Sequence, residues 1–192
     1  MKVFQSLTEP DLVTLLAAGA VGIMPTDTVY GLVARADRPE AVTRMYALKH
    51  REAKPGTSIA ANIEQLRTLG LPAAYLDRVA HLWPNPISVV IPHTLAYIHQ
   101  GRGDSPFRVV ADPDLQALLA QTGPLVTTSA NAPGEPTADD LASAQAYFGD
   151  RVDFYVDGGV QSDHAASTII GLTDDGIVVY RQGAIKVTEK ET

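Results

Sequence analysis

The sequence predicts an α/β protein in which a single twisted, mixed β-sheet is flanked by helices. Short apolar runs typical of buried strands alternate with helical segments through most of the chain, which favours parallel strand neighbours. Near the end, the apolar runs 168–172 and 177–180 flank the turn-forming residues 173–176, which indicates a β-hairpin. Because a hairpin is antiparallel, the sheet is expected to contain both kinds of strand pair.

Size and composition are consistent with one domain outside the membrane. The 192 residues are 45% hydrophobic, enough to bury a core, so we expect a single domain over residues 1–192. No apolar run approaches the roughly 20 residues of a membrane-spanning helix, and residues 1–5 lack the apolar core of a signal peptide. We therefore expect a cytoplasmic protein. The absence of cysteine excludes disulfides and thiolate metal sites.

The charge balance limits the partners of the chain. With 22 acidic and 15 basic residues, the formal net charge is −7. A broad nucleic-acid surface needs many cations to neutralise phosphates, so this composition argues against one. A local basic cavity remains compatible with it.

The first strand is expected at residues 21–24, and it ends at Pro25, which cannot donate to a central ladder. Gly31 follows shortly and allows the backbone to approach a bound molecule closely. Open α/β sheets bind ligands at the ends of strands, so this strand tip is a candidate site. The polar side chains between Pro25 and Gly31 are Thr26, Asp27, Thr28 and Tyr30.

Two early helices are expected, at 8–19 and from 37 to 48. In each, a capping side chain, Thr8 or Asp37, precedes a proline in the first turn, and apolar residues follow at helical spacing.

Lys49 and Arg51 stand at the end of the second helix. One interpretation is that both cations complement the negative end of the helix dipole. The other is that they bind a triphosphate, since lysine supplies a compact charge and arginine a planar fork.

The middle of the chain continues the alternation. The segment 83–86 contains two prolines and ends a helix, and the segment 101–106 is expected to be a loop. Strands are expected at 58–61, 87–91, 107–110, 124–126 and 152–156, and helices at 63–69, 72–83 and 112–121.

Arg108 lies inside the short, apolar strand expected at 107–110. Its side chain either alternates outward to solvent or serves a ligand, and single-sequence reasoning leaves both interpretations open.

The strand expected at 124–126 ends, like the first, in small polar side chains. An ordinary turn is one interpretation, because such residues are typical of turns, and Thr137 with Asp139 and Asp140 resembles a helix start. The recurrence of a strand tip crowded with neutral hydrogen-bonding groups favours a site instead. The polar residues of this second tip are Thr127, Thr128, Ser129 and Asn131.

Several familiar catalytic motifs are absent, including the P-loop, the dinucleotide-binding glycine motif, His-Glu-x-x-His and the nucleophile elbow. The five histidines show no spacing typical of metal ligands. Four cations near expected element ends, together with hydroxyl and amide side chains, suit a polyanion and a small polar molecule, bound electrostatically. These residues are Lys49, Arg51, Arg108 and Arg181, with Thr28, Thr127, Ser129, Asn131, Thr137 and Ser167.

Six segments resemble, in order and spacing, the YrdC-like family over nearly the whole chain. Each motif is weak alone, whereas the set is specific, and the resemblance is to the short, single-domain members. The segments are Pro25–Leu32, Lys49–Arg51, Trp83–Pro86, Ser129–Asn131, Asp157–Gly159, and Ser167–Thr168 with Arg181–Gly183.

The resemblance implies an L-threonylcarbamoyladenylate synthase, a nucleotidyltransferase that joins L-threonine, bicarbonate or CO2, and ATP and releases pyrophosphate. It implies that the catalytic residues are Lys49, Arg51, Ser129 and Asn131. It implies that ATP is held by Lys49, Arg51, Lys54, Ser129, Thr137 and Arg181, and L-threonine by Thr28, Arg108, Thr127 and Ser167.

The resemblance also implies Mg²⁺ bound with ATP. Such an ion bridges phosphate oxygens with few protein ligands, so no metal-binding motif is expected in the sequence. The product would feed threonylcarbamoylation of tRNA, which makes other proteins of that transfer the implied partners and leaves a direct tRNA contact open.

The chain departs from the family pattern in the loop after Arg51. No proline follows this arginine, and Ile59 or Ala60 stands where many members have a histidine. Two other interpretations therefore remain open. One is a diverged paralogue that acts on another substrate, and the other is an RNA-binding or ribosome-associated module without turnover, against which the net charge of −7 counts.

Overall fold

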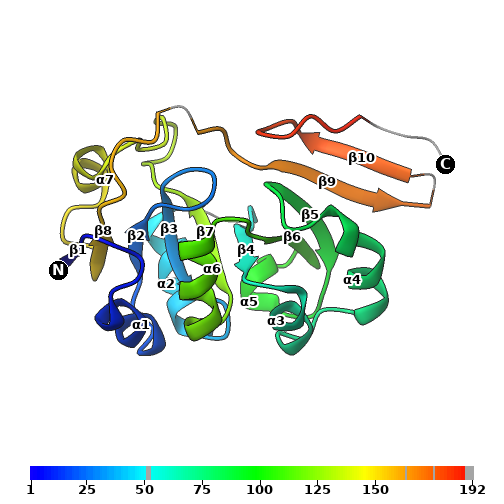
Figure 1. The fold of residues 1–192 in the computed structure, drawn as a ribbon, viewed down its shortest axis with the longest axis horizontal. Coiled ribbons are helices and arrows are strands. Elements are labelled where there is room, and N and C mark those ends of the chain that lie inside the picture. Colours follow the sequence, from blue (N-terminus) through cyan, green and yellow to red (C-terminus); the bar gives the residue numbers. More distant parts are fainter. Residues whose placement is uncertain (51–52, 163, 175, 189–192) are drawn as a thin grey trace.

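The computed structural model describes residues 1–50, 53–162, 164–174 and 176–188. Within them, ten strands form one sheet in the order β1-β8-β2-β3-β7-β4-β6-β5-β9-β10. Parallel pairs such as β4 with β6 occur beside antiparallel pairs such as β3 with β7, and helices flank the sheet (Figure 1). The predicted mixed α/β sheet is confirmed.

The strands are β1 (Lys2–Phe4), β2 (Gly22–Met24), β3 (Gly31–Arg35), β4 (Thr57–Ala60), β5 (Ile87–Pro92), β6 (Asp104–Val109), β7 (Leu125–Ser129), β8 (Phe154–Val156), β9 (Thr168–Thr173) and β10 (Gly176–Arg181). The α-helices are α1 (Pro10–Ala17), α2 (Pro39–Leu48), α3 (Ile63–Thr68), α4 (Ala73–Val79), α5 (Ala96–His99), α6 (Pro113–Thr122) and α7 (Leu141–Phe148), and a 3₁₀ turn, η1, covers Ala80–Leu82. None of the helices in these described ranges is both long and apolar enough to span a bilayer.

The strands β1, β8, β2, β3 and β7 form what we call the two-sided half of the sheet, because helices pack on both of its faces. Leu32 of β3 lies in a buried cluster with Met45 of α2. Its neighbour Val33 lies in a different cluster, with Leu16 of α1 and Leu119 of α6. Since successive strand residues point to opposite faces, α2 and the pair α1 and α6 cover opposite sides of this half.

The strands β6, β5, β9 and β10 form what we call the one-sided half, and β4, whose Ile59 lies in the cluster of Leu119 of α6, joins it to the two-sided half. On one face, Phe107 and Val109 of β6 pack in a buried cluster with Leu66 of α3 and Leu76 of α4. Arg108 lies between these two residues in the strand, so its side chain points to the opposite face. That face bears a hollow, which Arg108 lines.

The cap residues show which local signals predicted the helices correctly. The side chains of Asn62 and Asp112 accept hydrogen bonds from backbone N–H groups at the starts of α3 and α6, as expected of caps. Thr8 and Asp37 are not the caps of α1 and α2, and that prediction is wrong. Glu9 and Arg38 take those positions without a side-chain hydrogen bond, and Asp37 instead binds Arg35.

The helix start predicted at Thr137 with Asp139 and Asp140 is confirmed at the last of these residues. The helix α7 begins at Leu141, and the side chain of Asp140 accepts the hydrogen bond from Ser143 N–H that caps it.

Three strand predictions need correction. Residues 104–106, expected in a loop, belong to β6, where Ser105 and Pro106 pair with Ile91 and Val90 of the antiparallel neighbour β5. The strands β1 and β3 were not expected from the sequence. The hairpin expected at the end of the chain is confirmed as β9 and β10, which pair antiparallel with a register shift between Val179 and Arg181.

After β10, the chain turns back alongside the start of β9. Gly183 N–H donates to Thr168 Oγ1 at 2.9 Å, and Ala184 N–H donates to Ala166 O at 2.9 Å. The Thr168 hydroxyl donates to Ile185 O. A Cβ atom on residue 183 would lie 2.1 Å from Ala166 O, so only glycine permits this close approach.

Candidate functional site

The hollow on the one-sided half is a cavity of about 110 Å³ at its junction with the two-sided half. Its wall is formed by the tip after β2, the start of β4, the end of β7, and residues of β6, β9 and β10. Six residues predicted to bind ligands from the sequence line it. They are Thr28, Arg108, Thr127, Ser129, Ser167 and Arg181.

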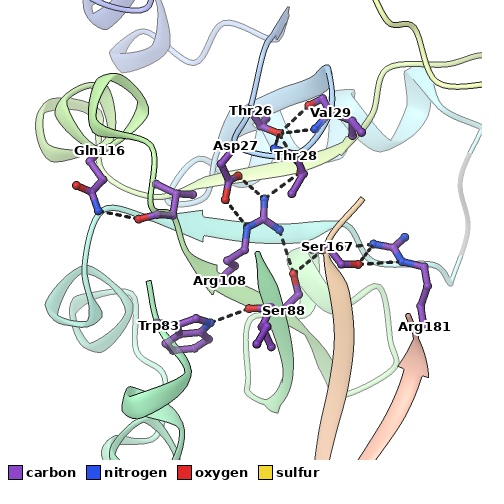
Figure 2. Close-up of polar contacts among 12 residues, drawn as sticks. Thr26, Asp27, Thr28, Val29, Trp83, Ser88, Arg108, Gln116, Ser167 and Arg181 are labelled. Atoms are coloured by element: carbon purple, nitrogen blue, oxygen red, sulfur yellow. Dashed lines mark hydrogen bonds and ion pairs between the residues drawn. The ribbon is translucent and has the colours of Figure 1, made fainter. Parts of the chain in front are cut away.

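Arg108 is bound bidentately by Asp27, a carboxylate of the predicted strand-tip site that had no predicted partner. Its Nη2 donates to Asp27 Oδ1 at 2.7 Å and its Nε donates to Asp27 Oδ2 at 3.1 Å (Figure 2). The Arg108 side chain is 2% exposed and that of Asp27 is 6% exposed. The interpretation that Arg108 faces solvent is therefore wrong. A buried charge needs such a partner, because desolvation is costly.

A chain of hydrogen bonds extends from Arg108 across the one-sided half. Arg108 Nη1 donates to Ser88 Oγ at 3.0 Å, and Ser88 Oγ donates to Ser167 Oγ at 2.9 Å. Arg181 Nη2 donates to Ser167 O at 2.8 Å and to Ser167 Oγ at 3.3 Å. Figure 2 shows these side chains in one continuous line from the strand tip to β10.

The strand tip after β2 is a tight turn held by its own hydroxyl groups. Thr26 Oγ1 donates to Val29 O at 2.6 Å and accepts the N–H groups of Thr28 and Val29 at 3.3 and 3.2 Å. Thr28 Oγ1 in turn accepts from Arg108 Nη2 at 3.4 Å. The turn therefore fixes the Thr28 hydroxyl beside the guanidinium.

Tyr30 links this tip to the segment after β8. Its hydroxyl accepts the N–H of Gly158 at 2.7 Å and donates to Gly159 O at 3.0 Å. Burial raises the pKa of Tyr30, and the hydrogen bond from Gly158 opposes that rise. The phenol is therefore a neutral structural link between the two segments.

Two glycines allow the end of β7 to close the hollow. A Cβ atom on Gly31 would lie 2.3 Å from Thr127 Oγ1, and one on Gly56 would lie 2.5 Å from Thr127 O. A side chain at either position would displace Thr127, which lines the hollow.

Lys49 and Asn131, predicted as catalytic, lie beside the hollow and are not among the residues that line it. Lys49 is 6% exposed, and its Nζ donates to Ser129 O at 3.0 Å, Asn131 O at 2.5 Å and Asn131 Oδ1 at 2.6 Å. Ser129 Oγ also donates to Asn131 Oδ1, at 2.7 Å. Lys49 and Asn131 thus support the backbone at Ser129, which does line the hollow.

The remaining described residues that were predicted to bind ATP are not among those that line the hollow. Lys54 lines a neighbouring cavity, which shares Pro55 and Pro106 with the hollow. Thr137 is half-buried and does not line the hollow. Arg51 lies outside the described residues.

Sequence reasoning placed Asp27 in the candidate site but missed its pairing with Arg108, and it missed Ser88 as a site residue. The signal for Asp27 was a carboxylate at a strand tip, in a chain with an arginine inside an apolar strand that needed a counter-charge. Ser88 is a single polar residue within the apolar strand β5, where it is 0% exposed. A buried hydroxyl there requires hydrogen-bond partners, although the sequence does not identify them.

The oxygen atoms available for a cation in the hollow are neutral. Among the described residues, no carboxylate lines the hollow, and no group of three or more His, Asp or Glu side chains is placed to hold a metal. Thr128 and Ser129 are among the residues that line the hollow, and Thr128 Oγ1 is buried without a hydrogen-bond partner in the described part of the chain. Such a set fits a cation that is bound mainly by an anionic ligand.

Known proteins match both the sequence and the fold. A family model named Sua5_yciO_yrdC and described as telomere recombination matches residues 14–183. The threonylcarbamoyl-AMP synthase of Pseudomonas aeruginosa strain UCBPP-PA14 is 37% identical over 166 residues, which cover 83% of this chain and 90% of that protein.

Two solved structures share the fold. P. abyssi Sua5, solved as a complex with L-threonine, has a TM-score of 0.83 and 26% sequence identity. That match covers 95% of this chain and 58% of the Sua5 chain, so this chain spans less than two-thirds of that protein. E. coli YciO has a TM-score of 0.79 at 22% identity, with 95% of each chain covered, which supports the fold alone.

The match of the family model extends over most of the chain, and a relative more than 30% identical agrees with it over a similar length. The chain therefore belongs to the Sua5/YciO/YrdC family.

Proposed function

We propose that this protein is a threonylcarbamoyl-AMP synthase, a nucleotidyltransferase that forms threonylcarbamoyl-AMP and pyrophosphate from L-threonine, bicarbonate or CO2, and ATP. The observation that carries the proposal is the convergence of six distant residues on one hollow, from Thr28 to Arg181. The named activity of the P. aeruginosa relative and the L-threonine bound to P. abyssi Sua5 support it.

In the proposed reaction, the amine of L-threonine attacks the carbon of CO2 and loses a proton, which gives a carbamate. A carbamate oxygen then attacks the α-phosphorus of ATP, and the bond from that phosphorus to the pyrophosphate oxygen breaks. Negative charge gathers on several groups at once. Donors and cations that are already in place stabilise this charge without reorganising.

The residues of the hollow divide between the two substrates. We assign Thr28, Arg108, Thr127 and Ser167 to L-threonine, since all four line the hollow and the guanidinium of Arg108 can bind a carboxylate. We assign Ser129 and Arg181, which also line the hollow, to the nucleotide. Arg51, Lys54 and Thr137 stay predicted nucleotide contacts.

Lys49 and Asn131 receive a supporting role in this proposal. Their contacts with each other and with Ser129 hold the loop after β7 in place. They would act on the nucleotide through Ser129, or directly after a rearrangement of these contacts when the phosphates bind.

We also propose Mg²⁺ as the cation that accompanies ATP. The hydroxyl group of Ser129, which lines the hollow, would hold it, and it would offset the charge of the phosphate oxygens. The remaining proposed features are a single domain over residues 1–192, a cytoplasmic location, and a product that is passed to proteins that modify tRNA.

The test is pyrophosphate release by the purified protein. We expect release that requires ATP, Mg²⁺, bicarbonate and L-threonine together, with little release when L-serine or L-valine replaces L-threonine. Release with a different amino acid would favour the diverged paralogue. No release with any amino acid, combined with salt-sensitive binding of tRNA, would favour an RNA-binding module and refute the proposal.

A further inference from the structure

The directions of the hydrogen bonds between Arg108 and Arg181 are determined by chemistry. A guanidinium only donates, so Ser88 Oγ must accept the bond from Arg108 Nη1 at 3.0 Å. The single hydrogen of the Ser88 hydroxyl is then available for Ser167 Oγ, 2.9 Å away. Arg181 Nη2 also donates to Ser167 Oγ, at 3.3 Å.

Ser167 Oγ therefore accepts from two sides, and its own hydrogen must point elsewhere. Within the described ranges, that hydrogen has no acceptor, and Ser167 is 3% exposed and lines the hollow. The bonds of the two neighbours thus make the Ser167 hydroxyl a donor towards the hollow.

Arg108 is left with one donor in the same way. Two of its five N–H groups go to Asp27, one to Ser88 and one to Thr28. The fifth, on Nη1, has no acceptor among the described residues. Asp27 does not line the hollow. It lines a separate cavity with Asp112, so it binds the guanidinium from outside the hollow.

We propose that Ser88 is a positioning residue that makes Arg108 and Ser167 a pair of donors for one carboxylate. Ser88 is fully buried and does not line the hollow, so it acts only through these two neighbours. The inference rests on the proposed function, in which the carboxylate is that of L-threonine. Two donors, one of them charged, suit the two oxygens of a carboxylate.

Removal of the Ser88 hydroxyl has a specific expected consequence. In Ser88→Ala, Arg108 Nη1 loses its acceptor and Ser167 loses one of the donors that orient its hydrogen. The Ser167 hydroxyl then becomes free to turn away from the ligand, whereas Arg108 keeps its bonds to Asp27 and Thr28 and loses only the bond that aligns Nη1. We expect the KM for L-threonine to rise about tenfold, which corresponds to the loss of one charge-assisted hydrogen bond, and the KM for ATP to change less than twofold.

The matched control is Ser105→Ala. Ser105 lies on the adjacent strand β6, is 1% exposed, and its hydroxyl binds His93 at 2.8 Å, away from Arg108. This variant loses a buried hydroxyl of the same size, and both KM values should stay within twofold of wild type. Ser88→Thr keeps a hydroxyl at the position and should restore the KM for L-threonine to within threefold.

A double-mutant cycle separates positioning from a general structural defect. In the Ser167→Ala background, Ser88→Ala should raise the KM for L-threonine by no more than threefold. Ser88 acts through Arg108 and Ser167, and in this background its effect through the Ser167 hydroxyl is already lost. A full tenfold effect in both backgrounds, or equal effects on the KM for L-threonine and the KM for ATP, would overturn the proposal.

Calorimetric titration provides a readout that does not depend on turnover. Wild-type protein should bind L-threonine about tenfold more tightly than L-threoninamide, which lacks the carboxylate, and Ser88→Ala should lose this preference. If wild type shows the preference but releases no pyrophosphate, the proposed function fails and the inference stands. If wild type releases pyrophosphate and Ser88→Ala keeps the preference, the inference fails and the function stands.

Discussion

The two halves of the sheet consist of similar short strands but use their second face differently. In the two-sided half, Leu32 and Val33 of one strand enter two different apolar clusters, so both faces are filled by helices. In the one-sided half, Phe107 and Val109 enter a cluster with α3 and α4, while Arg108 between them faces the hollow. One half is therefore a scaffold, and the other offers a polar face.

The site lies where the halves meet, and each contributes a different kind of group. The two-sided half supplies the strand tip with Asp27 and Thr28, which is held by the hydrogen bonds of the Thr26 hydroxyl. The one-sided half supplies Arg108 of β6, Ser88 of β5 and Ser167, which directly precedes β9. Substitutions in the two halves should therefore separate effects on substrate from effects on folding, and four predictions test this.

The largest effect is expected for Arg108→Met in the one-sided half. It leaves the Asp27 carboxylate buried without its partner, which costs about 3–5 kcal/mol of unfolding free energy. It also removes the cation proposed for L-threonine, so kcat/KM should fall at least about tenfold to a hundredfold. Denaturant unfolding and pyrophosphate release measure the two effects.

The control for this variant is the pair of changes Asp27→Asn with Arg108→Met, which removes both charges. We expect it to recover part of the lost stability but none of the lost activity. Full recovery of activity would mean that the guanidinium serves only the fold.

In the two-sided half, Phe154→Ala should cost about 3–5 kcal/mol of unfolding free energy. Phe154 is fully buried, packs edge-to-face on Phe4 with the ring centroids 6.1 Å apart, and fills the space left by Gly22. Because no substrate group is involved, both KM values of the folded fraction should stay unchanged. A selective rise in the KM for L-threonine would contradict the division between scaffold and site.

The third prediction concerns pH and stability in the one-sided half. Burial, and then the neighbouring His99, lower the pKa of His93 to about 4, while Asp104 opposes this shift. Its Nδ1 accepts Leu95 N–H at 3.2 Å, so Nε2 carries the proton and donates to Ser105 Oγ. The folded protein therefore holds His93 neutral.

An unfolded chain binds this proton below about pH 6.5, whereas the folded chain binds it only near pH 4. The contribution of His93 to stability is thus complete above pH 6.5 and is lost as the pH falls to 4, by about 3 kcal/mol in total. In His93→Gln, that part of the pH dependence should disappear from denaturant unfolding curves measured between pH 7 and pH 4. If the unfolding free energy of His93→Gln depends on pH as steeply as that of wild type, groups other than His93 cause the loss of stability.

The smallest effect is expected for Arg44→Met at the edge of the two-sided half. Arg44 forms an ion pair with Asp153. The side chain of Arg44 is 44% exposed and that of Asp153 is 36% exposed. An ion pair so open to solvent contributes less than about 1 kcal/mol. Denaturant unfolding measures the effect. A loss of unfolding free energy as large as that of Arg108→Met would show that solvent exposure does not determine how much an ion pair stabilises this fold.

Local signals predicted the fold class and much of the site. Pro25 ended a strand and marked the tip, Asn62 and Asp112 capped helices, and the residues at 173–176 marked the hairpin. These signals act within a few residues along the chain, so the sequence alone shows them. The predicted roles of individual residues in binding ATP and L-threonine remain predictions.

The missed features depend on contacts between distant segments. Asp27 meets Arg108 only because the sheet order brings the tip after β2 over β6, and Ser88 meets Ser167 because β5 pairs with β9. The strand β3 was missed because its partners β2 and β7 define it more than its own short pattern does. Lys49 donates to the backbone carbonyls of Ser129 and Asn131, which its own sequence did not indicate, and its role in binding ATP remains a prediction.

The return of the chain after β10 makes Ser167 dependent on residues that follow the last strand. The N–H groups of Gly183 and Ala184 bind on either side of Ser167, at Thr168 Oγ1 and Ala166 O. A variant truncated just after Arg181 would keep every strand of the sheet and still release the backbone that aims this hydroxyl. Loss of activity in such a truncation would therefore report a disturbed substrate contact, and a fused tag should begin beyond Ile185.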